Sequence, residues 1–403
     1  MHIVLQEWKK QEFPRAEFDR FAEEIHREYS LYVDVISPSF GTEWVLQAKG
    51  YVGYLPFSGG MIEIKPKVSV TNLFGMLDVA YDLKSFEVLK GLTDTSSLAD
   101  FYSRLASILA KRVLTRSRKG LYRTYKSERR ALAFVRGRID VRESMRSPLD
   151  PALVCRYEDH TTDVDENQII LWTLSTILRS GLCMGEFLAP VRHAYRILSR
   201  FTSLQHFSYT DCAGRLYNRL NDDYKPMHGL CRFFLEKSGP RQGTGSKKML
   251  PFVIGMHQLF EEFVAKWLTA RIESDGRYVL QSQQSLDAGS FKIVPDLVIE
   301  DSETHQPLLV ADTKYKLGEI VDKPDVYQIL AYARKLGCRE TVLLYPYEAE
   351  KPYNYDWNGT TVHCLSFDLS RSIEEGGEIL LSSLLDLCGQ ASNRITALEL
   401  EIR

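Results

Sequence analysis

The sequence predicts a mixed α/β protein with more than one domain. At 403 residues the chain is longer than one hydrophobic core usually serves. Its first part is rich in β-branched and aromatic residues between glycine-containing turns, its middle part has helical periodicity, and its last part alternates strands with helices. These patterns predict a β-rich domain over residues 1–95, a helical region over 96–240 and an α/β domain over 250–403.

Residues 1–95 carry strand signals and two helix signals. The expected strands lie within 31–37, 43–57 and 60–68. A helix is expected at 16–29, where apolar residues repeat at helical spacing. A second helix is expected at 71–83, with Thr71 or Asn72 as its N-cap, because a short side-chain oxygen can accept from the free amides of the first turn.

The middle region reads as amphipathic helices. Segments 99–117 and 165–182 place apolar residues on one helical face. Asp165 and Glu166 open the second segment and suit the positive end of a helix, although together with Asp163 they leave a second metal site open. Residues 238–248 are rich in glycine without apolar periodicity and predict a linker.

A basic stretch lies between residues 104 and 146, where fourteen Lys or Arg residues stand against three acids. Such an excess neutralises phosphates without sequence preference and predicts contact with DNA. A solvated helical face and a surface facing an acidic partner are the alternatives. The candidate DNA-binding residues are Arg116, Arg118, Lys119, Arg123, Lys126, Arg136 and Arg138. Gly137 predicts a tight turn before a short strand at 139–141.

Residues 250–403 predict a helix followed by a sheet. The expected order is a helix at 255–272, strands at 278–285, 291–299 and 308–315, a helix at 325–337, a strand at 340–346, further strands within 354–368 and a C-terminal helical region.

Targeting and redox signals are absent from the sequence. The N-terminus has no apolar core of a signal peptide, and no run of about eighteen apolar residues occurs. The seven cysteines include no C-x-x-C pair, which predicts reduced thiols. These features predict a cytoplasmic protein without a membrane partner.

Three charged residues interrupt two apolar strand segments of the C-terminal domain. Asp296 lies in the first segment, and Asp312 and Lys314 lie in the second. Side chains alternate along a strand, so Asp312 and Lys314 point to the same side. If Thr304 lies near the apex of the connecting turn, the numbers of two residues paired across the hairpin add up to 608. Asp296 then lies opposite Asp312.

Two carboxylates on paired positions predict a cation site. Directly opposed Cβ atoms lie about 4.5–5.5 Å apart. The carboxylates repel unless a cation lies between them, and a hard divalent ion such as Mg²⁺ or Mn²⁺ suits oxygen ligands. Such an ion supplies a nucleophilic water and stabilises charge on a phosphate oxygen. The alternative is a surface hairpin in which Lys314 forms a simple salt bridge with an acid.

Flanking helices carry further candidates. Glu261 or Glu262 can reach the ion from the preceding helix, unless both are solvated acids. Gln328 and Tyr332, four residues apart on the following helix, share one face. Gln328 is expected to fix a water or a phosphate. The alternative for this pair is ordinary helix packing, and Asp325 is expected to cap the helix.

The arrangement resembles the PD-(D/E)xK nuclease superfamily, with Asp296, Asp312 and Lys314 at the motif positions and Gln328 and Tyr332 in a Q-x-x-x-Y element. The segments GYVGYLPFSGGMIEIKPKV, NLFGMLDVAYDL, VRGRIDV, RYEDHTTDVDENQIILWTL and LFEEFV, in this order, further resemble the McrC family. That family supplies the nuclease subunit of GTP-dependent restriction systems directed at modified cytosine.

The resemblance implies a fold, a site and partners. It implies a restriction-endonuclease-like core in residues 250–403 that hydrolyses phosphodiester bonds with Mg²⁺ or Mn²⁺. The implied catalytic residues are Glu261, Asp296, Asp312, Lys314 and Gln328, and the implied metal ligands are Asp296, Asp312, Thr313 and Glu261. Glu261 is preferred over Glu262 because it directly follows Leu259–Phe260.

The implied partners are an McrB-like AAA+ GTPase ring and double-stranded DNA containing modified cytosine. The N-terminal domain, through its 51–60 hairpin, is expected to dock to the ring. Pairing of two nuclease subunits for double-strand cleavage is left open. The sequence contains no G-x-x-x-x-G-K-[ST] motif, which fits a subunit that depends on the motor of its partner.

Two other functions compete with this interpretation. A stand-alone repair nuclease or exonuclease would digest DNA with Mg²⁺ without any GTPase. A non-catalytic regulatory adaptor of a ring NTPase would stimulate its partner without cutting.

Overall fold

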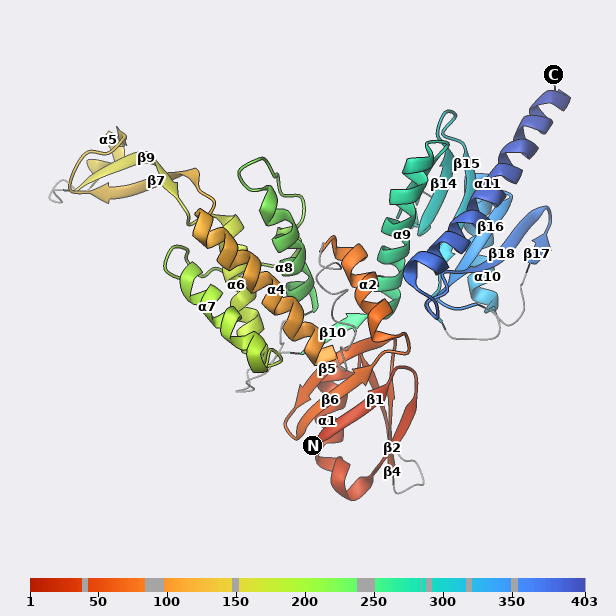
Figure 1. Cartoon of the computed structure of the whole chain (residues 1–403), viewed down its shortest axis with the longest axis horizontal. Coiled ribbons are helices and arrows are strands. Elements are labelled where there is room, and N and C mark those ends of the chain that lie inside the picture. Colours follow the sequence, from red (N-terminus) through yellow and green to blue (C-terminus); the bar gives the residue numbers. More distant parts are fainter. Residues whose placement is uncertain are drawn as a thin grey trace. The chain divides into compact units, whose positions relative to one another are not determined.

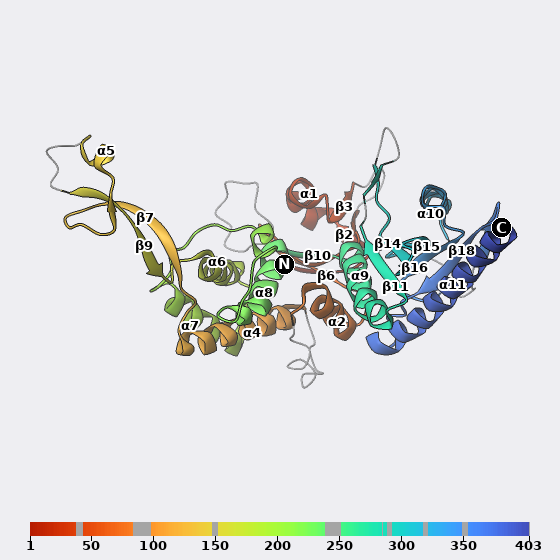
Figure 2. The ribbon, with the colours of Figure 1, turned by 90° about the horizontal axis from the view of Figure 1, so that it is seen from above.

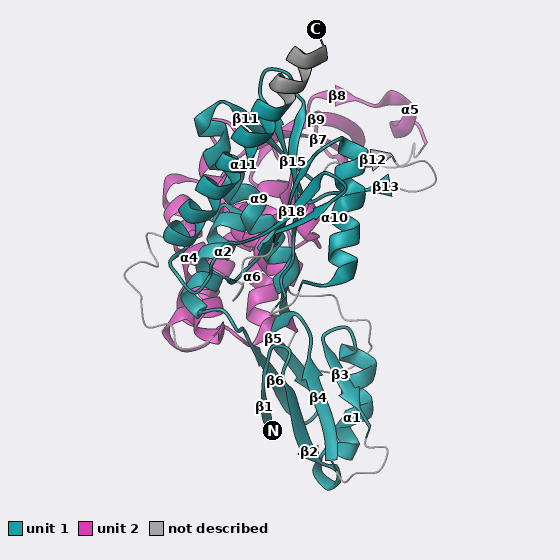
Figure 3. Cartoon of the chain, turned by 90° about the vertical axis from the view of Figure 1, so that its right-hand side faces the viewer, with its two compact units in different colours: residues 1–96, 253–403 teal, residues 97–252 magenta. Residues whose placement is uncertain are grey.

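The computed structural model describes residues 1–37, 43–83, 98–146, 152–237, 251–283, 285–287, 292–316, 321–348 and 354–402. The chain forms two compact units (Figure 3), one of residues 1–96 with 253–403 and one of residues 97–252. The predicted mixed α/β class is confirmed, while the predicted division into three domains stays a prediction. The predicted linker at 238–248 lies outside the described residues.

Among the described residues, the first part of unit 1 (Figure 1) forms small sheets together with the helices α1 and α2. Its elements are β1 (His2–Gln6), β2 (Lys10–Pro14), α1 (Arg15–Tyr29), β3 (Val33–Ile36), β4 (Glu43–Ala48), β5 (Tyr51–Phe57), β6 (Gly60–Lys65) and α2 (Val70–Tyr81). One sheet has the order β1-β6-β5-β10, where β10 (Phe252–Gly255) comes from the far end of the sequence, and the other has the order β2-β4-β3. The predicted helix at 16–29 is confirmed as α1, whose buried face includes Phe18 and Ile25.

The start of α2 differs from the prediction. Ser69 is the N-cap, and its hydroxyl accepts from the backbone amide of Asn72 at 3.1 Å. The helix therefore begins before Thr71, and Asn72 lies inside it. The side-chain amide of the buried Asn72 instead donates to the backbone carbonyls of Leu369 and Arg371, both at 2.8 Å.

Unit 2 combines helices with a long β-ribbon. Its elements are α4 (Leu98–Lys119), β7 (Thr124–Leu132), β8 (Arg138–Ile139), α5 (Val141–Ser144), β9 (Leu153–Thr161), α6 (Asp165–Ser180), η1 (Gly185–Phe187), α7 (Leu188–Leu198), η2 (Tyr209–Cys212), η3 (Asp222–Tyr224) and α8 (Lys225–Lys237). The helical prediction did not include the antiparallel β7–β9 pair. Few side chains of this ribbon are buried, so it lacks the apolar alternation from which a strand is recognised. Gly137, with φ of 72°, directly precedes β8 as predicted. The strand predicted at 139–141 is wrong in its bounds, because Asp140 caps helix α5, which begins at Val141.

The acids at the start of α6 act as helix-start residues. Arg215 contacts Asp165 at 3.2 Å and Glu166 at 3.3 Å. Asp163 accepts from the Ser203 amide at 2.7 Å.

The second part of unit 1 is a mixed sheet between helices. Its elements are α9 (Met256–Asp275), β11 (Tyr278–Ser282), β12 (Leu286–Asp287), β13 (Lys292–Ile293), β14 (Leu297–Asp301), β15 (Pro307–Thr313), α10 (Lys323–Leu336), β16 (Glu340–Tyr345), β17 (Asn354–Trp357), β18 (Thr360–Ser366) and α11 (Ile373–Ile402). The sheet order is β11-β14-β15-β16-β18-β17. Helices α9 and α11 cover one face and α10 covers the other (Figure 2).

The core under α9 and α11 is aromatic. Phe263 and Trp267 of α9 lie with their ring centroids 4.7 and 5.2 Å from that of Phe367. Gly377 of α11 packs against Trp267 so closely that an added Cβ would lie 2.2 Å from the indole ring. This glycine is therefore required for the contact between the two helices.

No helix in the described ranges is long and apolar enough to cross a membrane. All seven cysteines lie in those ranges and carry free thiols, as predicted.

We expect Gly377→Ala to lower the free energy of unfolding by about 1–3 kcal/mol, because the new methyl group overpacks a buried indole. Gly389→Ala is the matched control in the same helix, since no atom lies within 4 Å of its added Cβ. This variant should gain about 0.5–1 kcal/mol from replacing a helical glycine. Urea denaturation of the two variants measures both changes, and equal stability of the two would contradict the packing described for Gly377.

Candidate active site

The β14–β15 hairpin sets the register of the candidate site. Leu297 pairs with Ala311, and Ile299 pairs with Leu309, so paired positions sum to 608 as predicted. The turn is closed by Asp301, whose amide donates to the Gln306 carbonyl at 3.0 Å and whose carboxylate accepts from the Thr304 amide at 2.9 Å. Asp296 immediately precedes β14, and Asp312 lies near the end of β15.

The buried Asp312 and the half-buried Lys314 form an ion pair at the end of β15. The Asp312 side chain is 2% exposed and contacts the Lys314 ammonium through Oδ2. Their contact confirms that they share one side of the strand. Lys314 also donates to Gln328 Oε1 at 3.1 Å, and Gln328 donates to the Tyr332 hydroxyl at 2.7 Å. The predicted common face of Gln328 and Tyr332 is therefore confirmed, and it lies toward Lys314.

Asp296 is bound to Thr313. Its Oδ2 accepts from the Thr313 amide at 2.8 Å and from the Thr313 hydroxyl at 2.7 Å. The Asp296 carboxylate is thus turned toward Thr313, since the residue lies just outside the regular ladder of β14. Thr313, expected among the metal ligands, uses its hydroxyl and amide to hold Asp296.

Glu261 is the acid of α9 that lies near this group. Its Oε1 accepts from Gln283 Nε2 at 2.7 Å, and the Gln283 amide donates to the Asp296 carbonyl at 3.0 Å. Gln283 has a positive φ of 50°, a strained conformation for a residue with a side chain. Glu262 instead pairs with Lys266 at 3.5 Å, one helical turn further along α9.

The negative charge of Asp296 affects the pKa values of both Asp312 and Glu261. Burial, together with the negative charge of Asp296, raises the pKa of Asp312 to about 6, although Lys314 acts in the opposite direction. Burial also raises the pKa of Glu261, and Asp296 again adds to this effect. The site therefore concentrates negative charge that one ammonium does not fully balance.

The carboxylate oxygens of the candidate site are the kind of ligand that a hard divalent ion prefers. No three His, Cys, Asp or Glu side chains of the described residues converge closely enough to enclose a metal. Mg²⁺, however, commonly uses one or two carboxylates and keeps several waters. Asp296 and Asp312 supply two such carboxylates, with Glu261 as a neighbouring acid.

Asp325 is a site residue that the sequence did not identify. The prediction that it caps the helix is wrong, because Asp322 is the N-cap of α10 and Asp325 is a buried residue of its first turn. Its carboxylate lies 2.8 Å from Lys316 Nζ and 3.9 Å from Lys314 Nζ. The sequence did contain a signal for this residue. An acid at the start of a helix follows a strand and two lysines, Lys314 and Lys316.

The candidate DNA-binding residues all belong to unit 2, and two of them are engaged within it. Arg116 contacts Asp223 at 3.1 Å, and its side chain is only 18% exposed. Arg136 contacts Asp159 at 2.7 Å and lies over the Tyr157 ring at 4.1 Å. The remaining five residues are exposed: Arg118, Lys119, Arg123, Lys126 and Arg138.

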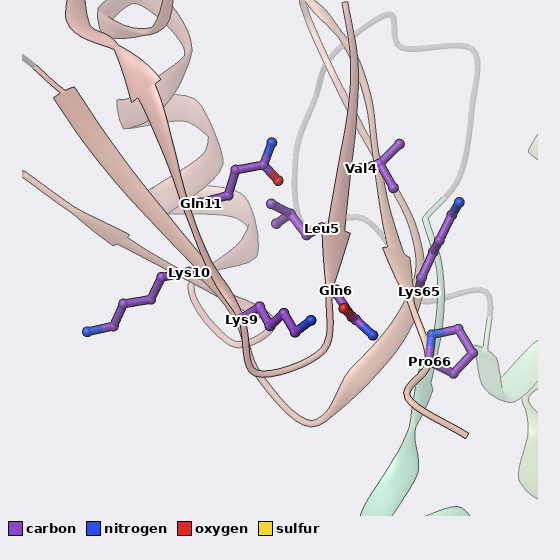
Figure 4. A pocket seen from close by; sticks show the side chains of 8 residues that line it. All are labelled: Val4, Leu5, Gln6, Lys9, Lys10, Gln11, Lys65 and Pro66. Carbon is purple, nitrogen blue, oxygen red and sulfur yellow. The ribbon is translucent and has the colours of Figure 1, made fainter. Parts of the chain in front are cut away.

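A hollow of about 500 Å³ lies elsewhere, on the N-terminal sheets (Figure 4). Its lining is Val4, Leu5, Gln6, Lys9, Lys10, Gln11, Lys65 and Pro66. It contains no candidate catalytic residue, so the chemistry described above does not depend on it. In the 51–60 hairpin, which is expected to dock to a partner, most residues of β5 are buried. Ser58, at the tip of the hairpin, is exposed.

Comparisons with known proteins agree on one family. The family model described as "McrBC 5-methylcytosine restriction system component" matches residues 46–346. The Type IV methyl-directed restriction enzyme EcoKMcrBC of Escherichia coli K12 is 23% identical over 337 residues, covering 76% of this chain and 94% of that protein. A solved assembly of Thermococcus gammatolerans McrB AAA+ hexamers with bound McrC contains a similar chain, with TM-score 0.62, 17% identity and coverage of 96% and 100%.

We expect Asp312→Asn to stabilise the metal-free protein at neutral pH. Because the folded-state pKa of Asp312 is raised to about 6, ionisation of this buried carboxyl weakens the fold as pH rises from about 4 to about 6. The variant lacks this loss and should gain about 2–3 kcal/mol above pH 6, at about 1.4 kcal/mol for each pKa unit. Below pH 4 the two proteins should be equally stable. Urea denaturation at several pH values measures the difference, and a gain independent of pH would show that ionisation is not its cause.

Proposed function

The chain belongs to the family of McrBC 5-methylcytosine restriction system components, and we propose that it is the metal-dependent DNA endonuclease subunit of such a system. The observation that supports this most strongly is the buried Asp312 carboxylate, which pairs with the half-buried Lys314 and feels the charge of Asp296 at the end of β15. A strand that only builds a core gains little from burying an acid and an amine, because their desolvation is costly. We further propose that residues 250–403 form a restriction-endonuclease-like core.

The proposed reaction adds water across a phosphodiester bond and yields a phosphate monoester and a free hydroxyl. Bound Mg²⁺ or Mn²⁺ supplies an activated water and neutralises charge on the phosphate. Asp296 and Asp312 would hold the ion, with Glu261 beside them. Lys314 orients the attacking water or stabilises the charge of the transition state, and its contacts with Asp312 and Gln328 fix its direction.

The proposed partner is an AAA+ GTPase of the McrB type. A similar chain occurs in the solved assembly of McrB AAA+ hexamers with bound McrC, and this sequence has no P-loop of its own. The chain would stimulate GTP hydrolysis in the ring and cut double-stranded DNA that contains modified cytosine. The exposed basic residues of unit 2 are the candidates for DNA contact.

We expect Asp312→Ala to reduce DNA cleavage by at least about a thousandfold, because the variant removes both a metal ligand and the counterion of Lys314. Stimulation of the partner's GTPase should persist. The assay is cleavage of modified DNA with partner, GTP and Mg²⁺. Asp386→Ala, which removes an exposed acid of α11, is the matched control and should cut like the native chain.

Retained cleavage by a clean preparation of Asp312→Ala would overturn the proposed site. DNA digestion by the native chain alone, without GTPase, would favour the stand-alone nuclease. Absence of cleavage by the native complex, with GTPase stimulation intact, would favour the adaptor.

Mg²⁺ should also stabilise the native chain without any reaction. A ligand at one hundred times its Kd stabilises the folded state by about 2.7 kcal/mol. We expect the thermal unfolding midpoint to rise with Mg²⁺ in the native chain and in Asp386→Asn, and to stay constant in the double variant of Asp296→Asn and Asp312→Asn. An equal rise in all three proteins would place the ion elsewhere.

A further inference from the structure

Glu7 is a buried acid far from the candidate site in sequence. It directly follows β1, and its side chain is 0% exposed. Its Oε2 accepts from the Tyr315 hydroxyl at 3.3 Å and from the Lys67 amide at 3.4 Å. Its Oε1 is buried and has no hydrogen-bond partner among the described residues. The positive charge of Lys67 offsets only part of the cost of burying this carboxylate, so the position calls for a role beyond packing.

Tyr315 connects Glu7 to the candidate site through its hydroxyl group. It is the residue after Lys314 and is only 6% exposed. Its ring centroid lies 5.9 Å from that of Phe260, the residue before Glu261. The Tyr315 ring therefore packs beside α9 next to the position of Glu261, and its hydroxyl donates to Glu7, which follows β1.

Lys314 needs such an anchor because it lies outside the strand. Strand β15 ends at Thr313. The Lys314 amide still donates to the Leu344 carbonyl at 2.8 Å. After that point the side chains hold the chain, through the contact of Tyr315 with Glu7 and those of Lys316 with Asp322 and Asp325.

The backbone around Glu7 is strained in a way that holds the acid in place. Trp8 has a φ of 63°, which is costly for an aromatic residue. Its amide donates to the Ala48 carbonyl at 3.0 Å, and the Glu7 amide donates to the Lys65 carbonyl at 3.1 Å. Strain of this kind persists only where the surrounding contacts determine the conformation, and it is often found where a position matters for function.

We propose that Glu7 and Tyr315 are positioning residues of the nuclease site, with the Glu7 carboxylate holding the Tyr315 hydroxyl so that Lys314 stays directed at Asp312 and Gln328. This inference rests on the proposed nuclease function. It makes the turn after β1 a part of the catalytic apparatus, although no Glu7 atom is proposed to touch DNA or metal. Burial raises the pKa of Glu7 to about 7, which shows that the ionised carboxylate is unfavourable at this position.

Four variants in the full complex with partner, GTP, Mg²⁺ and modified DNA test this inference. Tyr315→Phe keeps the ring and removes the hydroxyl, and Glu7→Leu removes the acceptor. Glu7→Gln keeps an oxygen that can accept from Tyr315. Tyr347→Phe is the matched control, because it removes another tyrosine hydroxyl from the surroundings of Glu7.

We expect Tyr315→Phe and Glu7→Leu each to lower the cleavage rate at saturating DNA by roughly ten- to a hundredfold, as small displacements of a catalytic group do. The DNA concentration at half-saturation and the partner's GTPase rate should stay unchanged. Glu7→Gln and Tyr347→Phe should remain within about twofold of the native rate, and the double variant of Glu7→Leu and Tyr315→Phe should be no slower than either single variant.

The outcomes separate this inference from the proposed function. If Asp312→Ala abolishes cleavage while Tyr315→Phe cuts like the native complex, the positioning role is overturned and the nuclease function stands. An additive loss in the double variant, or a loss in DNA affinity in place of turnover, overturns it as well. If the native complex does not cut DNA at all, the proposed function fails first.

Discussion

Burial of Asp312 beside Lys314 is the constraint on which the candidate site depends. A carboxylate that is 2% exposed loses most of its hydration, and the Lys314 ammonium offsets only part of that cost, as the raised pKa of Asp312 shows. Asp296 adds a second negative charge from the neighbouring strand. In the function proposed above, a cation would relieve this imbalance, so the feature that weakens the metal-free fold would also favour metal binding.

The site is assembled from segments far apart in the sequence. Helix α9 brings Glu261, the β14–β15 hairpin brings the two aspartates and the lysine, and α10 brings Gln328 and Asp325. Each side chain is fixed by a second contact, such as Thr313 for Asp296, and Gln283 for Glu261. Such a supporting layer of hydrogen bonds holds functional groups in one geometry.

The sequence predicted what depends on local periodicity and missed what depends on tertiary contacts. The hairpin register followed from the turn at Thr304 and the period of two along a strand, and it was correct. The direction of the Asp296 carboxylate did not follow, because Asp296 lies outside the ladder. Asp325 looked like a cap since helix starts favour acids, but its carboxylate faces two lysines of another segment. The β7–β9 ribbon was missed for a different reason, because strands exposed on both faces carry no apolar alternation.

The N-terminal sheets and the C-terminal α/β part belong to one compact unit, and several hydrogen bonds join them in addition to the packing of α2 on α9. The Asn72 amide holds two carbonyls near the start of α11, Lys266 of α9 binds the Ala80 carbonyl, and Glu7 holds Tyr315. Buried hydrogen bonds of this kind require specific geometry, whereas apolar contacts tolerate sliding. A displacement of the turn after β1 would therefore reach Lys314 through one hydroxyl group. The Glu7–Tyr315 hydrogen bond thus joins the N-terminal sheets to the backbone segment that carries Lys314.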